Sequence, residues 1–98
     1  MKNKHTLIPS CEKTLIIVNK LGLHARAATQ LVKLTNKFDA KITLYQGDKQ
    51  ASANSVLGLM MLESYQGKEV KVVCEGKDAK AALDAVETLI VKKFNENE

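Results

Sequence analysis

The chain has 98 residues, of which 45% are hydrophobic and 27% charged, and its formal net charge is +4. These values are ordinary for a small globular protein, and a chain of this length encloses one modest core without room for a deep substrate cavity. No run of five or six like charges occurs, which argues against a dedicated nucleic-acid-binding arm, although a mildly positive field can still steer acidic partners.

The N-terminal segment, residues 1–10, is expected to form a flexible tail, and residues 11–98 a single domain. The apolar pair Leu7-Ile8 is too short for a signal-peptide core, and no segment approaches the length that crosses a membrane. We therefore expect a cytoplasmic protein that does not bind membranes.

The two cysteines, Cys11 and Cys74, match no metal-ligand or redox spacing. Cys74 continues the alternation of Val70 and Val72 and is expected to be a buried, reduced thiol. Cys11 lies near the terminus and carries no functional signal. No metal site is predicted.

Apolar periodicity predicts the elements of the first half of the chain. A strand is expected from Lys13 to Val18, and a helix from about His24 to Asn36. A second strand, from Ala40 to Tyr45, alternates cleanly between apolar and polar residues. Gly47-Asp48 supplies hairpin-turn chemistry, and the short polar strand that follows, from Lys49 to Ala53, is typical of a sheet edge.

The second half continues with a short apolar helix from Val56 to Leu62 and a strand from Glu69 to Cys74. The last helix follows Asp78, a natural N-cap residue, and has the clearest amphipathic pattern in the chain. Its apolar positions are Ala79, Ala82, Leu83, Val86, Leu89 and Ile90. The residues from Asn95 onward are expected to form a polar tail.

The resulting order is β-α-β-β-α-β-α, and the helical stripes are apolar on one face only. Both features favour helices packed on one side of a largely antiparallel sheet. The fold class is therefore an α+β, two-layer open-faced sandwich with four strands and three helices on one face.

The candidate site is the turn between the first strand and the first helix. Gly22 marks that turn, so His24 falls at the start of the helix. A helix N-terminus offers unpaired N–H groups and the positive end of the macrodipole, which together attract anions. Arg26 adds a planar charged fork that suits phosphate oxygens. A nucleophilic imidazole in these surroundings predicts a histidine that carries a phosphoryl group.

The run from Asn19 to Ala27 resembles the active-site segment of HPr-like phosphocarrier proteins, which have a Gly-hydrophobic-His-x-Arg signature. A second element, Ser52 to Leu57, lies where that family has its regulatory serine, and the likeness extends from about Glu12 to Phe94. The lead-in Asn19-Lys20-Leu21-Gly22 and the sequence Asn54-Ser55-Val56 look more like the nitrogen-branch members (NPr) than the sugar-transport members.

The resemblance implies a carrier that takes a phosphoryl group on Nδ1 of His24 from a phosphoenolpyruvate-charged Enzyme I-type protein. It would pass the group to an Enzyme IIA-type protein, with Arg26 and Ala25 at the phosphate. No cofactor is implied, the protein is expected to be a monomer, and the spatial strand order is expected to be 1-4-2-3. Such a protein is a phosphocarrier with a covalent phosphohistidine intermediate rather than a self-contained catalyst. Ala27 departs from the family, which usually has Pro there, and is expected to loosen the loop slightly.

Ser55 has two interpretations. It is a good N-cap for the short helix, and in the family this serine can be phosphorylated by a dedicated kinase and restored by a phosphorylase. Around it, the resemblance places the partner-docking face. The candidate docking residues are Leu57 and Met60 from the short helix, with Lys33 and Gln30 as a polar rim.

Two other functions remain open at this stage. One is a regulatory relative of the family that binds partners without relaying phosphate, which Ala27 leaves possible. The other is a small basic nucleic-acid-binding domain, which would need aromatic residues for base stacking on the sheet. The sequence has four aromatics and no RNA-binding signature around them, so nucleic acid is not expected as a partner.

Overall fold

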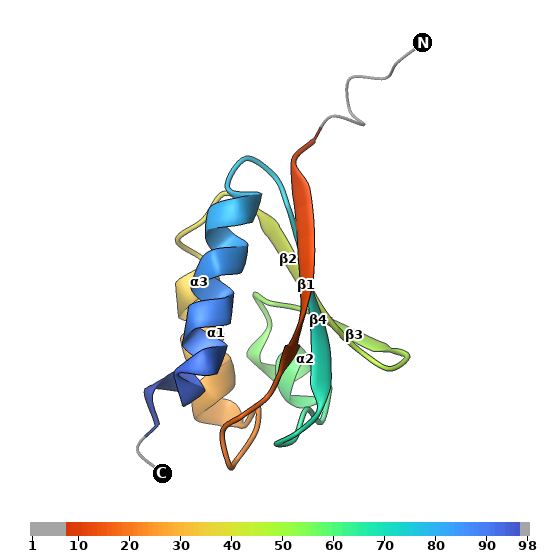
Figure 1. Ribbon diagram of the computed structural model, residues 1–98, viewed down its shortest axis with the longest axis vertical. Coiled ribbons are helices and arrows are strands. Elements are labelled where there is room, and N and C mark those ends of the chain that lie inside the picture. Colours follow the sequence, from red (N-terminus) through yellow and green to blue (C-terminus); the bar gives the residue numbers. More distant parts are fainter. Residues whose placement is uncertain (1–7, 97–98) are drawn as a thin grey trace.

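The computed structural model describes residues 8–96, which form a four-stranded sheet with helices packed on one face (Figure 1). The strands are antiparallel and lie in the order β1-β4-β2-β3. Their bounds are Ser10–Ile16 for β1, Lys41–Gln46 for β2, Lys49–Ser52 for β3 and Glu69–Glu75 for β4. The helices are α1 (Ala25–Thr35), α2 (Val56–Met60) and α3 (Ala79–Val91), and a 3₁₀ turn, η2 (Lys93–Asn95), follows α3.

This architecture confirms the predicted open-faced sandwich and strand order. The inward positions of β4 are Val70, Val72 and Cys74, all of which are fully buried, so the predicted burial of Cys74 is also confirmed. They face the apolar stripe of α3, in which Leu89 is only partly buried. Each layer buries only one of its faces. Alternation in the strands and three-to-four spacing in the helices were therefore sufficient to predict which residues face the core.

Several element boundaries differ from the prediction by one to three residues, and two of these differences have a clear structural cause. The first strand begins at Ser10 rather than Lys13, and the Pro9 carbonyl accepts a hydrogen bond from the Gly76 N–H at 2.8 Å. Residues 8–10 of the expected tail are thus described alongside the fold, whereas residues 1–7 lie outside the described residues. The short helix α2 ends at Met60 because its last turn tightens into hydrogen bonds between residues three apart, and Glu63 then takes a positive φ of 56°.

Asp78 precedes α3 as predicted, but its side chain makes no capping hydrogen bond. Its Oδ2 instead accepts the N–H of Asp39 at 2.8 Å, and the Asp78 N–H donates to the Asp39 carbonyl at 3.0 Å. The carboxylate therefore connects the start of α3 to the loop before β2. Residue type alone does not distinguish these roles, because the same oxygen can satisfy either donor.

The chain turns sharply after α3 instead of continuing as an extended tail. Lys93, Phe94 and Asn95 all have positive φ, between 54° and 62°, which is an unfavourable conformation for residues other than glycine. Burial of the Phe94 ring, which is 0% exposed, offsets that strain. The turn returns Glu96 to the N-terminal end of α1, where its carboxylate contacts His24.

Phe94→Ala should lower the free energy of unfolding by about 3–4 kcal/mol, because it removes a fully buried ring and with it the anchor of the strained turn. Chemical denaturation measures this loss. Val91→Ala is the matched control, since Val91 is 62% exposed one turn earlier and should change stability by less than about 0.5 kcal/mol. Equal effects of the two substitutions would contradict the anchoring role of Phe94.

Candidate functional site

His24 is the N-cap residue of α1, as the sequence predicted. Its backbone is extended, with φ of −79° and ψ of −177°, and its carbonyl accepts the Ala28 N–H at 2.8 Å. Its ring nitrogen Nδ1 accepts the Arg26 N–H at 3.2 Å. The imidazole therefore occupies the position where a helix usually has Ser, Asp or Asn, and its side chain is 27% exposed.

The loop before α1 is held in place by Gly22. This residue has a φ of +67°, and a Cβ there would lie 2.5 Å from the Ser64 carbonyl oxygen, so only glycine fits. The same carbonyl accepts the Leu23 N–H at 3.0 Å, and the Leu23 side chain is buried. These contacts fix the chain immediately before His24 and thus determine where the helix begins.

A buried network that the sequence did not predict reaches His24 from the other side. The Glu96 carboxylate contacts Nε2 of the imidazole, and its side chain is only 9% exposed. The amide of Asn19, itself fully buried, donates from Nδ2 to Glu96 Oε1 at 3.2 Å and to the Gly22 carbonyl at 2.8 Å. The sequence feature that could have indicated this network is Phe94, an apolar residue within an otherwise polar C-terminal segment.

These two contacts determine which nitrogen of His24 can act as a nucleophile. Because Nδ1 accepts a hydrogen bond from a backbone N–H, its lone pair is free of a proton. The ring proton then lies on Nε2, where the Glu96 carboxylate accepts it. The lone pair at Nδ1 lies at the N-terminus of α1, in the field that favours an incoming anion.

The neighbouring residues leave this end of the helix open to an anion. Ala25 and Arg26 are both exposed, and no residue in the described range 8–96 pairs with the Arg26 guanidinium. Ala27 is fully buried, so a small apolar residue at this position packs against the core. The structure thus places His24, Ala25 and Arg26 together in the first turn of α1.

Ser55 is the N-cap of α2, which confirms its predicted capping role. Its Oγ accepts the Gly58 N–H at 3.0 Å, and a Cβ on Gly58 would approach that oxygen to 3.0 Å. The glycine within the helix is therefore explained by the cap, because a side chain at position 58 would press on the serine hydroxyl.

The candidate docking residues lie on α1 and α2, which pack against each other. Leu57 is 68% exposed and Met60 40%, so neither contributes to the core. Lys33 is exposed, whereas Gln30 is half-buried and its Oε1 accepts the Asn95 Nδ2 at 3.5 Å. Further large apolar side chains are exposed at Leu21, Met61 and Tyr65.

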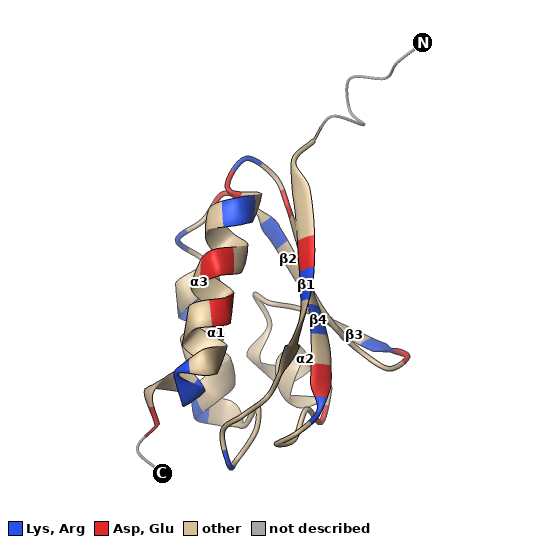
Figure 2. Ribbon diagram, viewed as in Figure 1, with Lys and Arg blue, Asp and Glu red and all other residues tan. Residues whose placement is uncertain are grey.

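Charge does not mark any other site. Figure 2 shows basic and acidic residues interspersed along the visible elements rather than gathered into a tract of one sign. Within residues 8–96, no three His, Cys, Asp or Glu side chains come together to hold a metal ion. No helix in that range is long and apolar enough to cross a membrane.

Comparisons with known proteins agree with this geometry. The family model for the "PTS HPr component phosphorylation site" matches residues 11–92. Phosphocarrier protein NPr of Shewanella violacea is 56% identical over 85 residues, which cover 87% of this chain and 93% of that protein.

Two solved structures extend the comparison. HPr-C-His from Thermoanaerobacter tengcongensis has a TM-score of 0.85 at 40% identity and covers 90% of this chain and 99% of its own. An HPr dimer from the same organism has a TM-score of 0.71 at 40% identity, covering 84% and 94% of the two chains.

The chain belongs to the HPr family of phosphocarrier proteins, which form part of the phosphotransferase system. The likeness found in the sequence around His24 and Ser55 is thereby confirmed at the level of the family.

Glu96→Gln should shift the neutral imidazole of His24 from the Nε2–H tautomer to a mixture of both tautomers, because an amide holds the ring proton less strongly than a carboxylate. ¹⁵N NMR shifts of the ring nitrogens measure the tautomer populations. Asp84→Asn, an exposed substitution on α3, is the control and should leave them unchanged. An unaltered ring spectrum in the Glu96 variant would contradict the role of this carboxylate.

Proposed function

We propose that this protein carries a phosphoryl group on Nδ1 of His24, taken from a phosphoenolpyruvate-charged Enzyme I-type protein and passed to an Enzyme IIA-type protein in the cytoplasm. The observation that carries the proposal is the pair of contacts at the imidazole: Nδ1 accepts the Arg26 N–H at the N-terminus of α1, and the opposite nitrogen faces Glu96. Family membership supports the same chemistry.

In the accepting step, Nδ1 releases the Arg26 N–H and attacks the phosphorus of the phosphorylated donor. The new N–P bond forms as the bond from phosphorus to the donor breaks, and the ring gains positive charge. Glu96 stabilises that charge through Nε2–H, so no proton has to leave the ring during transfer. The reverse steps deliver the group to the acceptor.

Charge on the phosphoryl oxygens is stabilised by groups of the first turn of α1. The Arg26 N–H, once released by Nδ1, faces the incoming oxygens together with the backbone at Ala25. The exposed Arg26 guanidinium has the planar donor geometry that phosphate oxygens accept. Groups that are already in place need little reorganisation when charge develops, which favours rapid transfer.

We assign the relay to the nitrogen-related branch of the phosphotransferase system. The 56% identity to the NPr of Shewanella violacea supports this assignment. The lead-in Asn19-Lys20-Leu21-Gly22 supports the same assignment, because it looks more like the nitrogen-branch members than the sugar-transport members.

Partner docking is proposed on the exposed apolar residues Leu57 and Met60, bordered by Lys33 and Gln30. Exposed apolar side chains beside a reactive group are typical of a transient interface. We propose that the protein docks as a monomer, although an HPr dimer is known from Thermoanaerobacter tengcongensis. Light scattering coupled to size exclusion distinguishes the two states.

Incubation with phosphoenolpyruvate and an Enzyme I-type protein should add one acid-labile phosphoryl group to the wild type and none to His24→Ala, as read by intact mass. Arg26→Lys should slow uptake about tenfold or more, because lysine retains the charge and loses the planar fork. Its free energy of unfolding should stay within about 0.5 kcal/mol of the wild type.

The donor itself tests the pathway. A nitrogen-branch donor should phosphorylate the chain faster than a sugar-branch donor, and the reverse order would assign the protein to sugar transport. No phosphate from either donor would favour a regulatory family member that binds partners without relaying phosphate. Ala27→Pro would then test whether the missing proline is the cause.

Ser55 is proposed as a regulatory phosphorylation site as well as a cap, because added negative charge would lie beside Leu57 on the docking face. Ser55→Ala should lower the free energy of unfolding by about 1 kcal/mol through loss of the cap, without slowing transfer. Ser55→Asp keeps a capping oxygen and should slow transfer to the acceptor while stability is retained. Equal transfer rates for both variants would contradict regulation at this position.

A further inference from the structure

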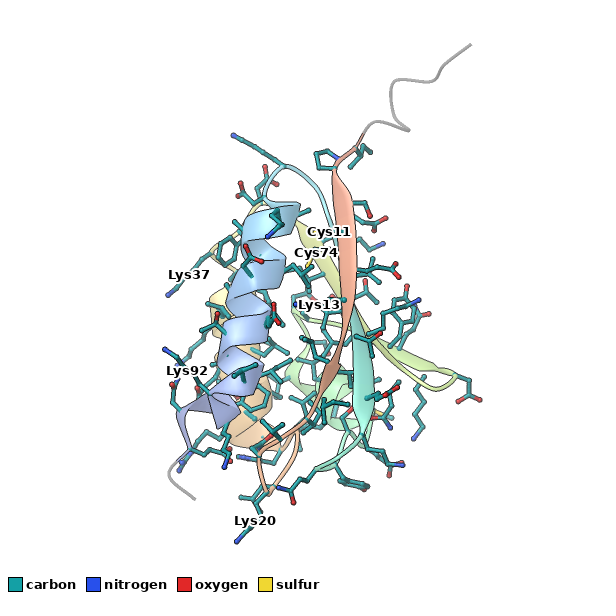
Figure 3. All side chains as sticks on the ribbon, in the orientation of Figure 1. Cys11, Lys13, Lys20, Lys37, Cys74 and Lys92 are labelled. Atoms are coloured by element: carbon teal, nitrogen blue, oxygen red, sulfur yellow. The ribbon has the colours of Figure 1, made fainter. Side chains whose placement is uncertain are left out.

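The two cysteines, which lie far apart in the sequence, are direct neighbours across the β1–β4 ladder. Cys11 is the register partner of Cys74, and both are free thiols. The same ladder pairs Leu15 with Val70, two buried residues, so alternation puts Cys11 and Cys74 on the same helix-facing side of the sheet. Figure 3 labels the two side chains next to each other, at the end of the sheet away from the Lys20 loop.

The backbone geometry at this position already suits a disulfide. Residues directly opposite each other in an antiparallel pair have Cα atoms about 4.5 or 5.5 Å apart, depending on the hydrogen-bonding pattern. Disulfides span Cα separations of about 4.4 to 6.8 Å. The Cα separation expected for this directly opposed pair therefore lies within the range that a disulfide spans.

The two thiols differ in their surroundings, which gives each a separate part in oxidation. Cys74 is fully buried, and desolvation, with a smaller contribution from the charge of Cys11, raises its pKa to about 11. Cys11 is half-buried, near the start of an edge strand.

We propose that Cys11 and Cys74 form a redox-sensitive pair that closes into an intrachain disulfide joining β1 to β4. The oxidant is a low-molecular-weight disulfide of the glutathione type. Cys11 attacks one of its sulfurs, which releases the first small thiol and leaves a mixed disulfide on Cys11. Cys74 then attacks the Cys11 sulfur and displaces the second small thiol.

The electrons and protons of this exchange balance. The two protein thiols lose two electrons and two protons, and the small disulfide gains them and leaves as two thiols. The second step uses the buried Cys74 thiol, which is rarely ionised, so its intrinsic rate of attack on a disulfide is low. Direct opposition in the ladder compensates for this, because the two sulfurs are held at a high effective concentration.

Closure would stabilise the fold without involving His24. Among the described strands, β1 pairs only with β4, and the crosslink would enclose most of the domain between the two cysteines. A crosslink around a long loop restricts the unfolded chain and thereby raises stability. An intracellular disulfide of this kind is typically transient and responds to redox conditions.

The full chain should therefore be incubated with increasing ratios of oxidised to reduced glutathione. We expect intact mass to fall by two hydrogens, both thiols to become resistant to alkylation, and Tm to rise by roughly 10 °C. Dithiothreitol should reverse all three changes. Cys11→Ser is the matched control because it changes the more exposed thiol, and its Tm should not respond to the oxidant.

Three results would overturn the proposal. One is a glutathione adduct on Cys11 that persists without closure, and another is a disulfide-linked dimer on a non-reducing gel. The third is closure that leaves Tm unchanged. Cys74→Ala provides a second check, since it should accumulate the adduct on Cys11 and never lose the mass of two hydrogens.

Discussion

The contact between Gly22 and the Ser64 carbonyl is the constraint on which the site depends. It brings two loops so close that no side chain fits at position 22, and the Leu23 N–H bonds to the same oxygen. Because these contacts set the direction of the chain before α1, they decide that His24 becomes its N-cap. A histidine one residue further along would lie inside the helix, where Nδ1 could not accept the N–H of the first turn.

The C-terminal turn connects the stability of the fold to the chemistry of the site. Three consecutive left-handed residues are unfavourable, and burial of Phe94 in the core holds them in place. This strained turn positions Glu96 beside the site. Its carboxylate contacts Nε2 of His24 through one oxygen and accepts a hydrogen bond from the Asn19 amide through the other. The site is thus assembled from both ends of the domain.

The proposed docking residues show how a small domain can leave apolar side chains exposed. A small domain has few apolar side chains with which to build its core. Even so, Leu57 and Met60, on the five-residue helix α2, are exposed and do not contribute to it. That helix persists because the Ser55 cap and the absence of a side chain on Gly58 let its first turn close. A short, capped helix that exposes apolar residues is well suited to brief contacts with other proteins.

The sequence by itself determined the elements and the sandwich, and it indicated His24 as the residue for which we propose the role of nucleophile. Alternation and three-to-four spacing report which face is buried, and the glycine–histidine–arginine spacing reports a helix start with anion-binding chemistry. The tertiary structure decided the contacts between distant segments: Glu96 against His24, Asp78 against Asp39, and Cys11 opposite Cys74. Local patterns do not contain these pairings, because each depends on how the chain folds back over many residues, and a polar residue near a terminus looks the same whether it is solvated or buried.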